Sequence, residues 1–403
     1  MTQPSNTQQS RPHLHSSVWL AEAQSSQRDM LASLQQLKSD YPQQDLTVLA
    51  SHRANRAEIF EFADQYFYEP REPKADSQVI TLDTDAPVSR WQFVLEQCQA
   101  NNVKVLLTGR NGIDYEAHRE AFEASGIRLL TGATSVEMLD KIDDKFQFIQ
   151  HCQAHDIPVS KGWRFDSLEE LTQLLDKHGH QPLCVKPITG IFAQGFWRLD
   201  TGTTLTSDDS HPNSEQERNY DSFEHLYFTE EKKINTEQYI SAYANSQMVH
   251  ERPIPMLLMP YLAGQEYSID VVCERGEVLA AVTRHKVGKI QYIGYDEGVM
   301  AVVMPLIKAF GCDGIVSVQT KQDDAGVHRV LEINSRPSGG IGYTNHSGID
   351  LTQIGFAYWL GWSEKPNLAD VAKQITPCQV RSIMVSVKIE GDGEEETDED
   401  NED

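Results

Sequence analysis

Two residues that could bind a metal ion stand near the end of the chain at the spacing of a β-strand. Residues 330–334 are predicted to form a strand, and a strand alternates its side chains between two faces. Glu332 and Asn334 therefore share one face, while Leu331 and Ile333 share an apolar back. A carboxylate and an amide oxygen on one face are ligands that suit Mg²⁺.

A second strand is predicted just upstream, over residues 315–320. A turn centred on Ala325 and Gly326 would join the two strands into a hairpin and set Gln319 opposite Glu332. The polar face of that hairpin would then carry a carboxylate and amide oxygens, a set that can hold a metal ion and phosphate. The alternative is an amphipathic hairpin whose polar face is merely solvated.

Composition narrows the class of protein. The 403 residues are enough for two or three domains, and the formal net charge of −25 argues against binding to a nucleic-acid backbone. No apolar run reaches the length of a membrane span, and the polar N-terminus lacks the apolar core of a secretory signal. Six cysteines without a C-x-x-C pair suggest reduced core residues in a cytoplasmic protein. No membrane or nucleic-acid partner is expected.

The elements that must position these residues follow two patterns. Residues 17–132 alternate strands with helices, which predicts a parallel sheet. No G-x-G-x-x-G follows the first strand, so the dinucleotide-binding fingerprint is absent. Residues 200–222 are polar and rich in turn formers, and we interpret them as an inserted loop. Downstream, residues 254–282 return to strands, and a helix over 298–310 precedes the hairpin.

Four upstream segments complement the hairpin. Lys145 opens a predicted helix after two aspartates, and Lys186 lies in a predicted strand. Gly190 and Gly195 bound a loop whose glycines permit unusual dihedrals and close approach of backbone N–H groups to phosphate. An apolar run over 259–262 leads to a carboxylate four residues later. Together, in this order, these segments resemble the ATP-grasp superfamily over residues 134–362.

The resemblance implies an α/β architecture. It consists of an N-terminal parallel-sheet domain of the kind that precedes ATP-grasp domains, then a two-lobed ATP-grasp fold with an α+β lid lobe and an antiparallel-sheet C-terminal lobe. The expected bounds are a flexible leader at 1–16, the N-terminal domain at 17–132, the ATP-grasp region at 133–378, and an end strand with a disordered acidic tail at 379–403. Within the ATP-grasp region the lid lobe is expected at about 160–262 and the C-terminal lobe at about 263–378.

The resemblance also implies roles for individual residues. Contacts to ATP are expected from the following residues: Lys145, Lys186, Gly190, Gly195, Met259, Pro260, Tyr261, Leu262 and Glu266. Mg²⁺, with Mn²⁺ as an alternative ion, is expected at Gln319, Glu332 and Asn334. Arg336 and Lys186 are expected to act in catalysis on the transferred phosphoryl group. A glutamine at position 319 resembles the carbamoyl-phosphate-synthetase-like branch of the superfamily.

Candidate substrate contacts come from two further segments. Arg284 and Lys286 belong to the densest basic cluster of the chain, which either binds phosphate or a substrate carboxylate or is a solvated β-turn. Ser338, Gly339 and His346 follow the hairpin and are candidates for contact with the acceptor substrate. For His346, the alternative is a loop that leads into a helix.

The predicted function is an ATP-dependent ligase that joins a small carboxylate to an amine or a thiol. Such an enzyme activates the carboxylate as an acyl phosphate and releases ADP and phosphate. Catalysis would rest on positioning and charge neutralisation. Two alternatives remain: a kinase in the same cleft and a non-catalytic ATP-binding regulatory protein. A homodimer is a family-level expectation.

Overall fold

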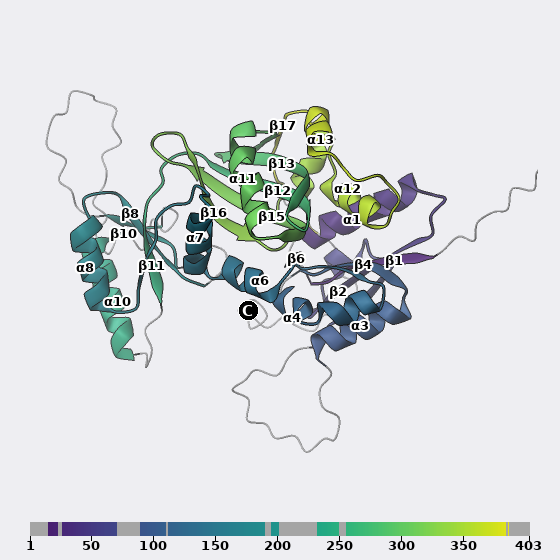
Figure 1. Ribbon diagram of the computed structural model, residues 1–403, viewed down its shortest axis with the longest axis horizontal. Coiled ribbons are helices and arrows are strands. Elements are labelled where there is room, and N and C mark those ends of the chain that lie inside the picture. The colour runs from purple at the N-terminus through teal and green to yellow at the C-terminus, as the bar shows by residue number, and fades with distance from the viewer. Residues whose placement is uncertain are drawn as a thin grey trace, which may run out of the picture.

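A computed structural model describes residues 15–22, 26–70, 89–109, 112–189, 195–200, 232–249, 255–383 and 386. Three β-sheets organise the chain (Figure 1). The expected α/β architecture, with a parallel N-terminal sheet followed by mixed and antiparallel sheets, is confirmed. The predicted leader, the inserted loop and the acidic tail fall largely outside the described residues.

The N-terminal sheet is parallel, with strand order β3-β2-β1-β4-β5. Its strands are β1 (Ser16–Leu20), β2 (Leu46–His52), β3 (Gln65–Tyr68), β4 (Val103–Leu107) and β5 (Arg128–Leu130). Four of these strands, β1, β2, β4 and β5, are buried along most of their length, because helices cover both faces of the sheet. The order reverses between β1 and β4, which makes their carboxyl ends a topological switch point.

Helices cover both faces of this sheet. They are α1 (Ser26–Asp40), α2 (Ala57–Phe60), α3 (Arg90–Ala100), α4 (Gly112–Glu116) and α5 (Arg119–Ala124). One core unites Trp19 and Leu49 with α3 and α5. The opposite face, with Met30 and Leu34 of α1, shares its core with Phe356 in the C-terminal part of the chain. The N-terminal sheet therefore shares one apolar core with the C-terminal part of the chain.

The second sheet has the order β10-β9-β8-β11-β7. Its strands are β7 (Trp163–Phe165), β8 (Leu183–Pro187), β9 (Trp197–Asp200), β10 (Lys233–Asn235) and β11 (Met256–Pro260). Helices α8 (Leu168–His178) and α10 (Thr236–Val249) pack on it around Phe165, Leu183 and Tyr243. Of these, β9, β10 and α10 were not predicted from the sequence.

Helices α6 (Val136–Asp143) and α7 (Lys145–Ala154) link the first two sheets. The spacing of Thr134 and Glu137 is that of a capping box and predicts Thr134 as the cap of α6. Ser135 takes that position instead, and its side chain accepts a hydrogen bond from the Met138 N–H. At α7 the Asp144 side chain accepts from the N–H groups of Phe146 and Gln147. Each helix therefore begins with a side-chain oxygen as its cap, and the Asp144 cap makes Lys145 the first residue of α7.

The third sheet is antiparallel, with the order β16-β15-β12-β13-β14-β17, and β6 pairs with β15 off this path. Its strands are β6 (Gly132–Ala133), β12 (Glu266–Glu274), β13 (Glu277–Val287), β14 (Ile290–Gly294), β15 (Cys312–Gln322), β16 (His328–Asn334) and β17 (Cys378–Val380). Helix α11 (Glu297–Ala309) covers one face. The other face packs on η2 (Ile341–Ser347), α12 (Leu351–Trp359) and α13 (Leu368–Gln374).

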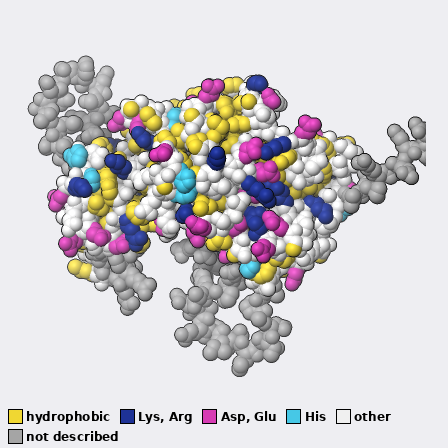
Figure 2. All heavy atoms as spheres, viewed as in Figure 1, with side chains coloured by type: hydrophobic (Ala, Val, Ile, Leu, Met, Phe, Trp, Pro, Cys, Tyr) yellow, Lys and Arg dark blue, Asp and Glu magenta, His cyan; other side chains and the backbone are white. Residues whose placement is uncertain are grey.

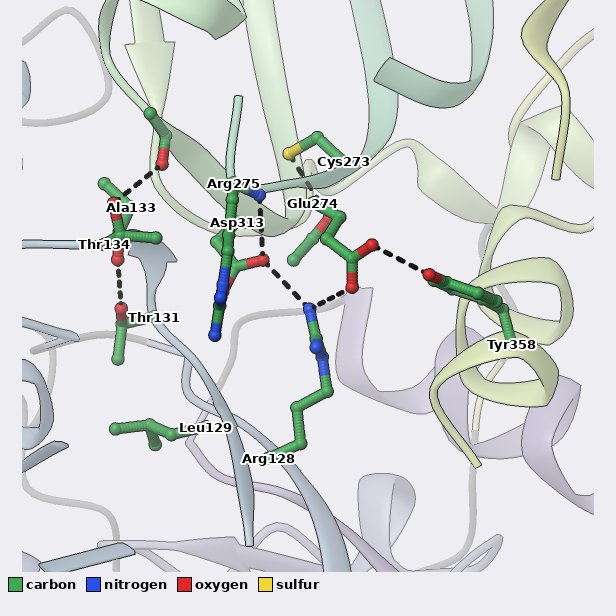
Figure 3. A network of polar contacts seen from close by, with 12 residues as sticks. Arg128, Leu129, Thr131, Ala133, Thr134, Cys273, Glu274, Arg275, Asp313 and Tyr358 are labelled. Atoms are coloured by element: carbon green, nitrogen blue, oxygen red, sulfur yellow. Dashed lines mark hydrogen bonds and ion pairs between the residues drawn. The ribbon is translucent and has the colours of Figure 1, made fainter. Parts of the chain in front are cut away.

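A network of ion pairs joins the N-terminal sheet to the third sheet (Figure 3). The Arg128 guanidinium on β5 lies 2.8 Å from the Glu274 carboxylate and 3.2 Å from the Asp313 carboxylate. The Tyr358 hydroxyl on α12 donates to the other Glu274 oxygen at 2.8 Å. On the face drawn in Figure 2, basic side chains gather where these two sheets meet. Asp313 is buried, so this junction depends on its arginine partner.

The structure bears on two expectations drawn from composition: the state of the cysteines and the presence of a membrane-spanning helix. All six cysteines are unpaired thiols; five are buried and Cys378 is partly buried. Within the described part of the chain, no helix combines the length and the apolar character that a bilayer crossing requires.

Candidate functional site

The β15–β16 hairpin carries the predicted metal ligands. Gln319 is paired with Glu332, as expected, and the Asn334 amide donates to a Glu332 carboxylate oxygen at 3.2 Å. The register at the turn differs by one residue from the expected one, because Gln322 pairs with His328 and not with Arg329. All three polar side chains nevertheless share one face of the hairpin.

A β-bulge restores the predicted pairing of Gln319 with Glu332 after this one-residue shift. Thr320 pairs with Val330 and Gln319 with Glu332, so Leu331 is the extra residue on β16. The prediction that Leu331 lies on the apolar back was wrong: it is partly exposed, and Val330 is buried at 1% exposure in its place. The bulge changes the direction of the side chains along β16, and the polar face begins at the next residue, Glu332.

The two predicted phosphate lysines come from different elements that are tied together. Lys145 is the first residue of α7, and its backbone N–H donates to the Ile188 carbonyl at 3.1 Å. Lys186 lies on β8, where it pairs with Leu257 of β11. Both side chains are partly buried. The start of α7 is thereby held beside the end of β8.

Lys145 and Lys186 both interact electrostatically with Glu332. Burial lowers the pKa of Lys145, and the Glu332 carboxylate opposes that shift. Burial likewise lowers the pKa of Lys186; Glu332 opposes it, and the positive charge of Lys145 adds to it. Two cations are therefore held close enough to repel each other, with one carboxylate between their segments. A polyanion entering this crevice would relieve that repulsion.

Arg336 follows β16 and belongs to the same electrostatic neighbourhood. Its charge acts on Asp143 at the end of α6, as does that of Lys145. One Arg336 NH group donates to the Pro337 carbonyl at 3.4 Å. The predicted catalytic arginine therefore lies near the end of α6 and the start of α7.

The predicted adenine hinge joins the second and third sheets. Met259 and Pro260 end β11, and the Tyr261 N–H donates to the Pro182 carbonyl at 2.9 Å. Leu262 is partly buried, and Glu266 opens β12 with its side chain 46% exposed. The predicted hinge and the carboxylate predicted to bind the ribose therefore follow each other where the second sheet leads into the third.

Two basic residues at this hinge were missed by the sequence analysis. The Arg198 guanidinium lies 4.6 Å and the Lys321 ammonium 5.3 Å from the centre of the Tyr261 ring. Lys321 also lies 4.0 Å from the Glu266 carboxylate. Burial raises the pKa of Glu266, the charge of Lys321 opposes this, and Glu332 adds to it. Isolated basic residues on strands give no sequence signal for such stacking.

The glycine loop is described at its end alone. Gly195 has φ +68°, and a Cβ there would lie 3.0 Å from the Pro187 ring, so a side chain would be strained. Gly190 lies outside the described residues.

Arg284 is not part of a solvated turn. It lies on β13, is 8% exposed, and its Nε donates to the Asp270 carboxylate at 3.0 Å. A second guanidinium nitrogen donates to the Ser338 hydroxyl at 2.8 Å. Ser338 is thereby tied to the third sheet two residues after Arg336. The alternative of a solvated β-turn therefore fails for Arg284, whereas Lys286 is exposed beside the turn at residues 288–289.

The remaining substrate candidates are scattered. Lys286 and Gly339 are exposed. His346 is exposed on η2 and lines an open hollow of about 560 Å³ between α1 and η2. None of the predicted ATP or metal residues line that hollow.

The donor set of the hairpin fits a magnesium ion. In the part of the chain that the structure describes, no three or more His, Cys, Asp or Glu side chains converge as a metal site. The hairpin instead offers one carboxylate, Glu332, with the amides of Gln319 and Asn334 beside it. Such a set is too small to enclose a metal ion. It suits Mg²⁺, which keeps several waters and shares the phosphates of its substrate.

Comparison with known proteins supports the same fold. Residues 252–384 match the family model described as ATP-grasp in the biosynthetic pathway with Ter operon. No curated protein sequence matches the chain. The sequence-based resemblance to the ATP-grasp superfamily is confirmed.

Solved structures resemble the whole chain at low sequence identity. L-amino acid ligase from Bacillus licheniformis has a TM-score of 0.56 and 13% identity, covering 90% of this chain and 77% of that one. N5-carboxyaminoimidazole synthetase from Staphylococcus aureus has a TM-score of 0.57 and 12% identity, covering 88% and 80%. Biotin carboxylase from Campylobacter jejuni has a TM-score of 0.56 and 14% identity, covering 89% and 73%. At these identities the likeness shows a shared fold.

Proposed function

Since this chain has the ATP-grasp fold, we propose that it is an ATP-dependent ligase that activates a small carboxylate as an acyl phosphate. The acyl phosphate is then attacked by an amine or a thiol, with release of ADP and phosphate. Several proteins of similar fold are ligases or carboxylases by name, which supports ATP-dependent carboxylate chemistry.

One observation carries this proposal. Lys145 and Lys186 arise from separate elements, yet both interact with Glu332 on a third. Two like charges held close together and partly buried repel each other, and the single charge of Glu332 opposes the effect for both, so a bound polyanion would stabilise the arrangement further. A triphosphate supplies several negative charges in a small volume, and the hairpin beside the lysines offers ligands for its magnesium ion.

The chemistry follows from the poor reactivity of a carboxylate. An amine does not displace oxide from it, so one carboxylate oxygen first attacks the γ-phosphorus of ATP, and the bond from that phosphorus to the bridging oxygen breaks. The amine nitrogen then attacks the acyl carbon, phosphate leaves with the former carboxylate oxygen, and the nitrogen loses a proton. No side-chain nucleophile is required, so positioning and charge neutralisation are the main tasks of the protein.

The described residues divide these tasks. Lys145 and Lys186 neutralise the phosphates, and Arg336 stabilises the transferred phosphoryl group and then the acyl phosphate. Gln319, Glu332 and Asn334 would hold Mg²⁺, which when bound supplies positive charge to the phosphate oxygens. Tyr261 and its neighbours border the base, and Glu266 accepts hydrogen bonds from the ribose hydroxyls.

The proposal is tested by a substrate screen. The full chain with MgATP is offered pairs drawn from small carboxylates, amino acids, amines and thiols, and ADP and phosphate are both quantified. The proposal predicts equal amounts of ADP and phosphate that require both the carboxylate and the nucleophile. Lys186→Ala and Glu332→Ala should abolish this release while the far-ultraviolet circular dichroism spectrum stays unchanged.

Other outcomes would contradict the proposal in distinguishable ways. ADP formed without free phosphate would indicate a kinase in the same cleft. ATP binding without turnover across the whole panel would indicate a regulatory protein. Undiminished, substrate-dependent phosphate release by both variants would remove Lys186 and Glu332 from the site.

A further inference from the structure

The carboxyl edge of the N-terminal sheet borders the crevice of the proposed ligase. Strand order reverses between β1 and β4, the position where open parallel sheets bind ligands. From this edge α4 packs against α6, which leads to Lys145. A Cβ added to Gly132, just beyond β5, would meet the Ser335 carbonyl oxygen at 2.2 Å. The edge therefore contacts the segment that carries Arg336.

Buried charged side chains gather at this edge. Glu22 follows β1, Glu69 follows β3, and Arg90 is the first residue of α3; they are 4%, 3% and 3% exposed. Arg53, just after β2, binds Glu22 with two hydrogen bonds, from Nε at 2.7 Å and from one terminal nitrogen at 3.1 Å. Both oxygens of Glu22 are therefore occupied.

The second carboxylate accepts hydrogen bonds at both of its oxygens. One Glu69 oxygen accepts the Ser51 hydroxyl at 2.5 Å and the Glu22 N–H at 3.2 Å. The other accepts the Tyr115 hydroxyl at 3.3 Å and lies 3.3 Å from Arg90 Nε. Glu69 is therefore the ion-pair partner of the Nε edge of the arginine, and it supplies no hydrogen-bond partner to Arg90 Nη1.

Arg90 is the member of this cluster with unused donors. Its Nε and one terminal nitrogen are buried and have no hydrogen-bond partner among the described residues. An unmet buried donor is costly, and more so when it is charged, so native structures nearly always supply a partner. Glu69 faces Arg90 Nε, so the unmet donor furthest from any carboxylate of the cluster is Nη1, and an oxygen from outside the described chain would supply its acceptor.

We infer that Arg90 is the anchor of a second binding subsite, which receives an oxyanion, carboxylate or phosphate, of a small-molecule substrate. The inference rests on the proposed ligase function for its link to catalysis, since the edge adjoins Arg336. A guanidinium presents paired N–H groups that match the two oxygens of either anion. The subsite would hold one substrate by its charged group while another group reaches the crevice.

The charge balance of the cluster permits an added anion. Two carboxylates and two guanidiniums cancel. Burial raises the pKa of Glu69, while Ser51 and Arg90 oppose the shift. Protonation of Glu69 can therefore relieve its repulsion of an incoming anion.

The inference is tested by equilibrium binding of two probes, acetate and methylphosphonate, each bearing a methyl group visible in saturation-transfer NMR. Acetate represents a carboxylate source and methylphosphonate a phosphate source. The wild-type full chain should bind at least one of them. Lys186→Met should retain this binding, because the triphosphate lysines belong to a different site.

The decisive variant is Arg90→Lys, which keeps a positive charge beside Glu69 but loses the forked donors. It should bind the preferred probe about tenfold more weakly or worse. The double variant Arg90→Met/Glu69→Gln removes both buried charges together, which keeps the fold testable, and should lose the binding. Tyr115→Phe removes a hydroxyl from the same cluster and should bind normally. Thermal melts establish that each variant is folded.

Two results would overturn the inference. The first is the absence of saturation transfer to either probe in the wild type. The second is unchanged binding by a folded Arg90→Lys variant, which would mean that a bound water satisfies the arginine. The experiment involves no ATP turnover, so a failed ligase screen leaves it valid, and a failed probe experiment leaves the ligase proposal standing.

Discussion

Replacing Lys186 by methionine should weaken ATP binding without unfolding the protein. Methionine keeps the length and much of the volume of the lysine stem on β8, so packing changes little. Glu332 loses one cationic neighbour but keeps Lys145. The mutual repulsion of the two lysines also disappears. We therefore expect the melting temperature to change by no more than a few degrees.

The size of the effect follows from the charges. A lysine about 4 Å from one phosphate charge gains roughly 4 kcal/mol at an effective dielectric constant of 20, before its desolvation is counted. Lys186 is already partly buried without nucleotide, and burial lowers its pKa, so part of that desolvation has occurred before ATP binds. A charge-assisted contact contributes roughly 1.5–3 kcal/mol net. That corresponds to a rise in Kd of about 10- to 150-fold.

Isothermal titration calorimetry with a non-hydrolysable ATP analogue and Mg²⁺ measures this directly. The matched control is Lys177→Met, the same substitution on the exposed side of α8 in the same lobe, which should leave Kd unchanged. A folded Lys186→Met variant whose Kd stayed within twofold of the wild type would refute the assignment of Lys186 to the phosphates.

Three further perturbations probe the charge, the domain junction and the backbone. Because burial lowers the pKa of Lys186, this side chain should lose its charge at a lower pH than an ordinary lysine, and the ATP affinity should decrease with it. In titrations from pH 7 to 10, Lys186→Arg should show a smaller decrease. Arg128→Met should lower the free energy of unfolding by about 2 kcal/mol in urea melts at pH 7, because Asp313 stays buried without that partner. Burial raises the pKa of Asp313 above its value in the unfolded chain, so the cost of keeping this carboxylate charged grows as pH rises. The loss of stability in Arg128→Met should therefore be smaller near pH 4 than at pH 7. A loss that did not change with pH would contradict this reasoning. Gly132→Ala, at φ +99° and against the Ser335 carbonyl, should cost about 1–3 kcal/mol from backbone strain and reduce ADP release; wild-type values for both would show that the contact is not rigid.

Local patterns were sufficient for much of the fold. The alternating strands and helices of residues 17–132 predicted the parallel sheet that the structure contains, because buried parallel strands are apolar throughout. Strand β9, which ends where a polar stretch begins, and strand β10 and helix α10, which follow that stretch, were missed. The cap of α6 was misplaced by one residue because Thr134 and Ser135 can both accept the required hydrogen bond.

At the site, the pairing of Gln319 with Glu332 was predicted from an assumed turn, and the structure reaches it by a different route. A one-residue shift in register at the turn and a bulge at Leu331 compensate for each other. A bulge depends on packing against distant segments, such as the Val330 N–H donating to the Pro158 carbonyl, so sequence periodicity did not reveal it.

The buried cluster at the carboxyl edge was invisible in the sequence. Glu22, Glu69 and Arg90 are separated by long intervals and carry no spacing signal. Topology alone brings the ends of β1 and β3 together with the start of α3. Arg284 illustrates the same limit, because its partner Asp270 lies on the neighbouring strand and its partner Ser338 more than fifty residues away.

The central claim is that three separate segments form one crevice around a magnesium-bound triphosphate. A crystal structure with Mg²⁺ and a non-hydrolysable ATP analogue tests it most directly. We predict the phosphates between Lys145 and Lys186, with the metal ion on the face of β16 that carries Glu332 and Asn334. A nucleotide bound elsewhere, with these lysines contacting solvent and no metal ion at the hairpin, would contradict the account.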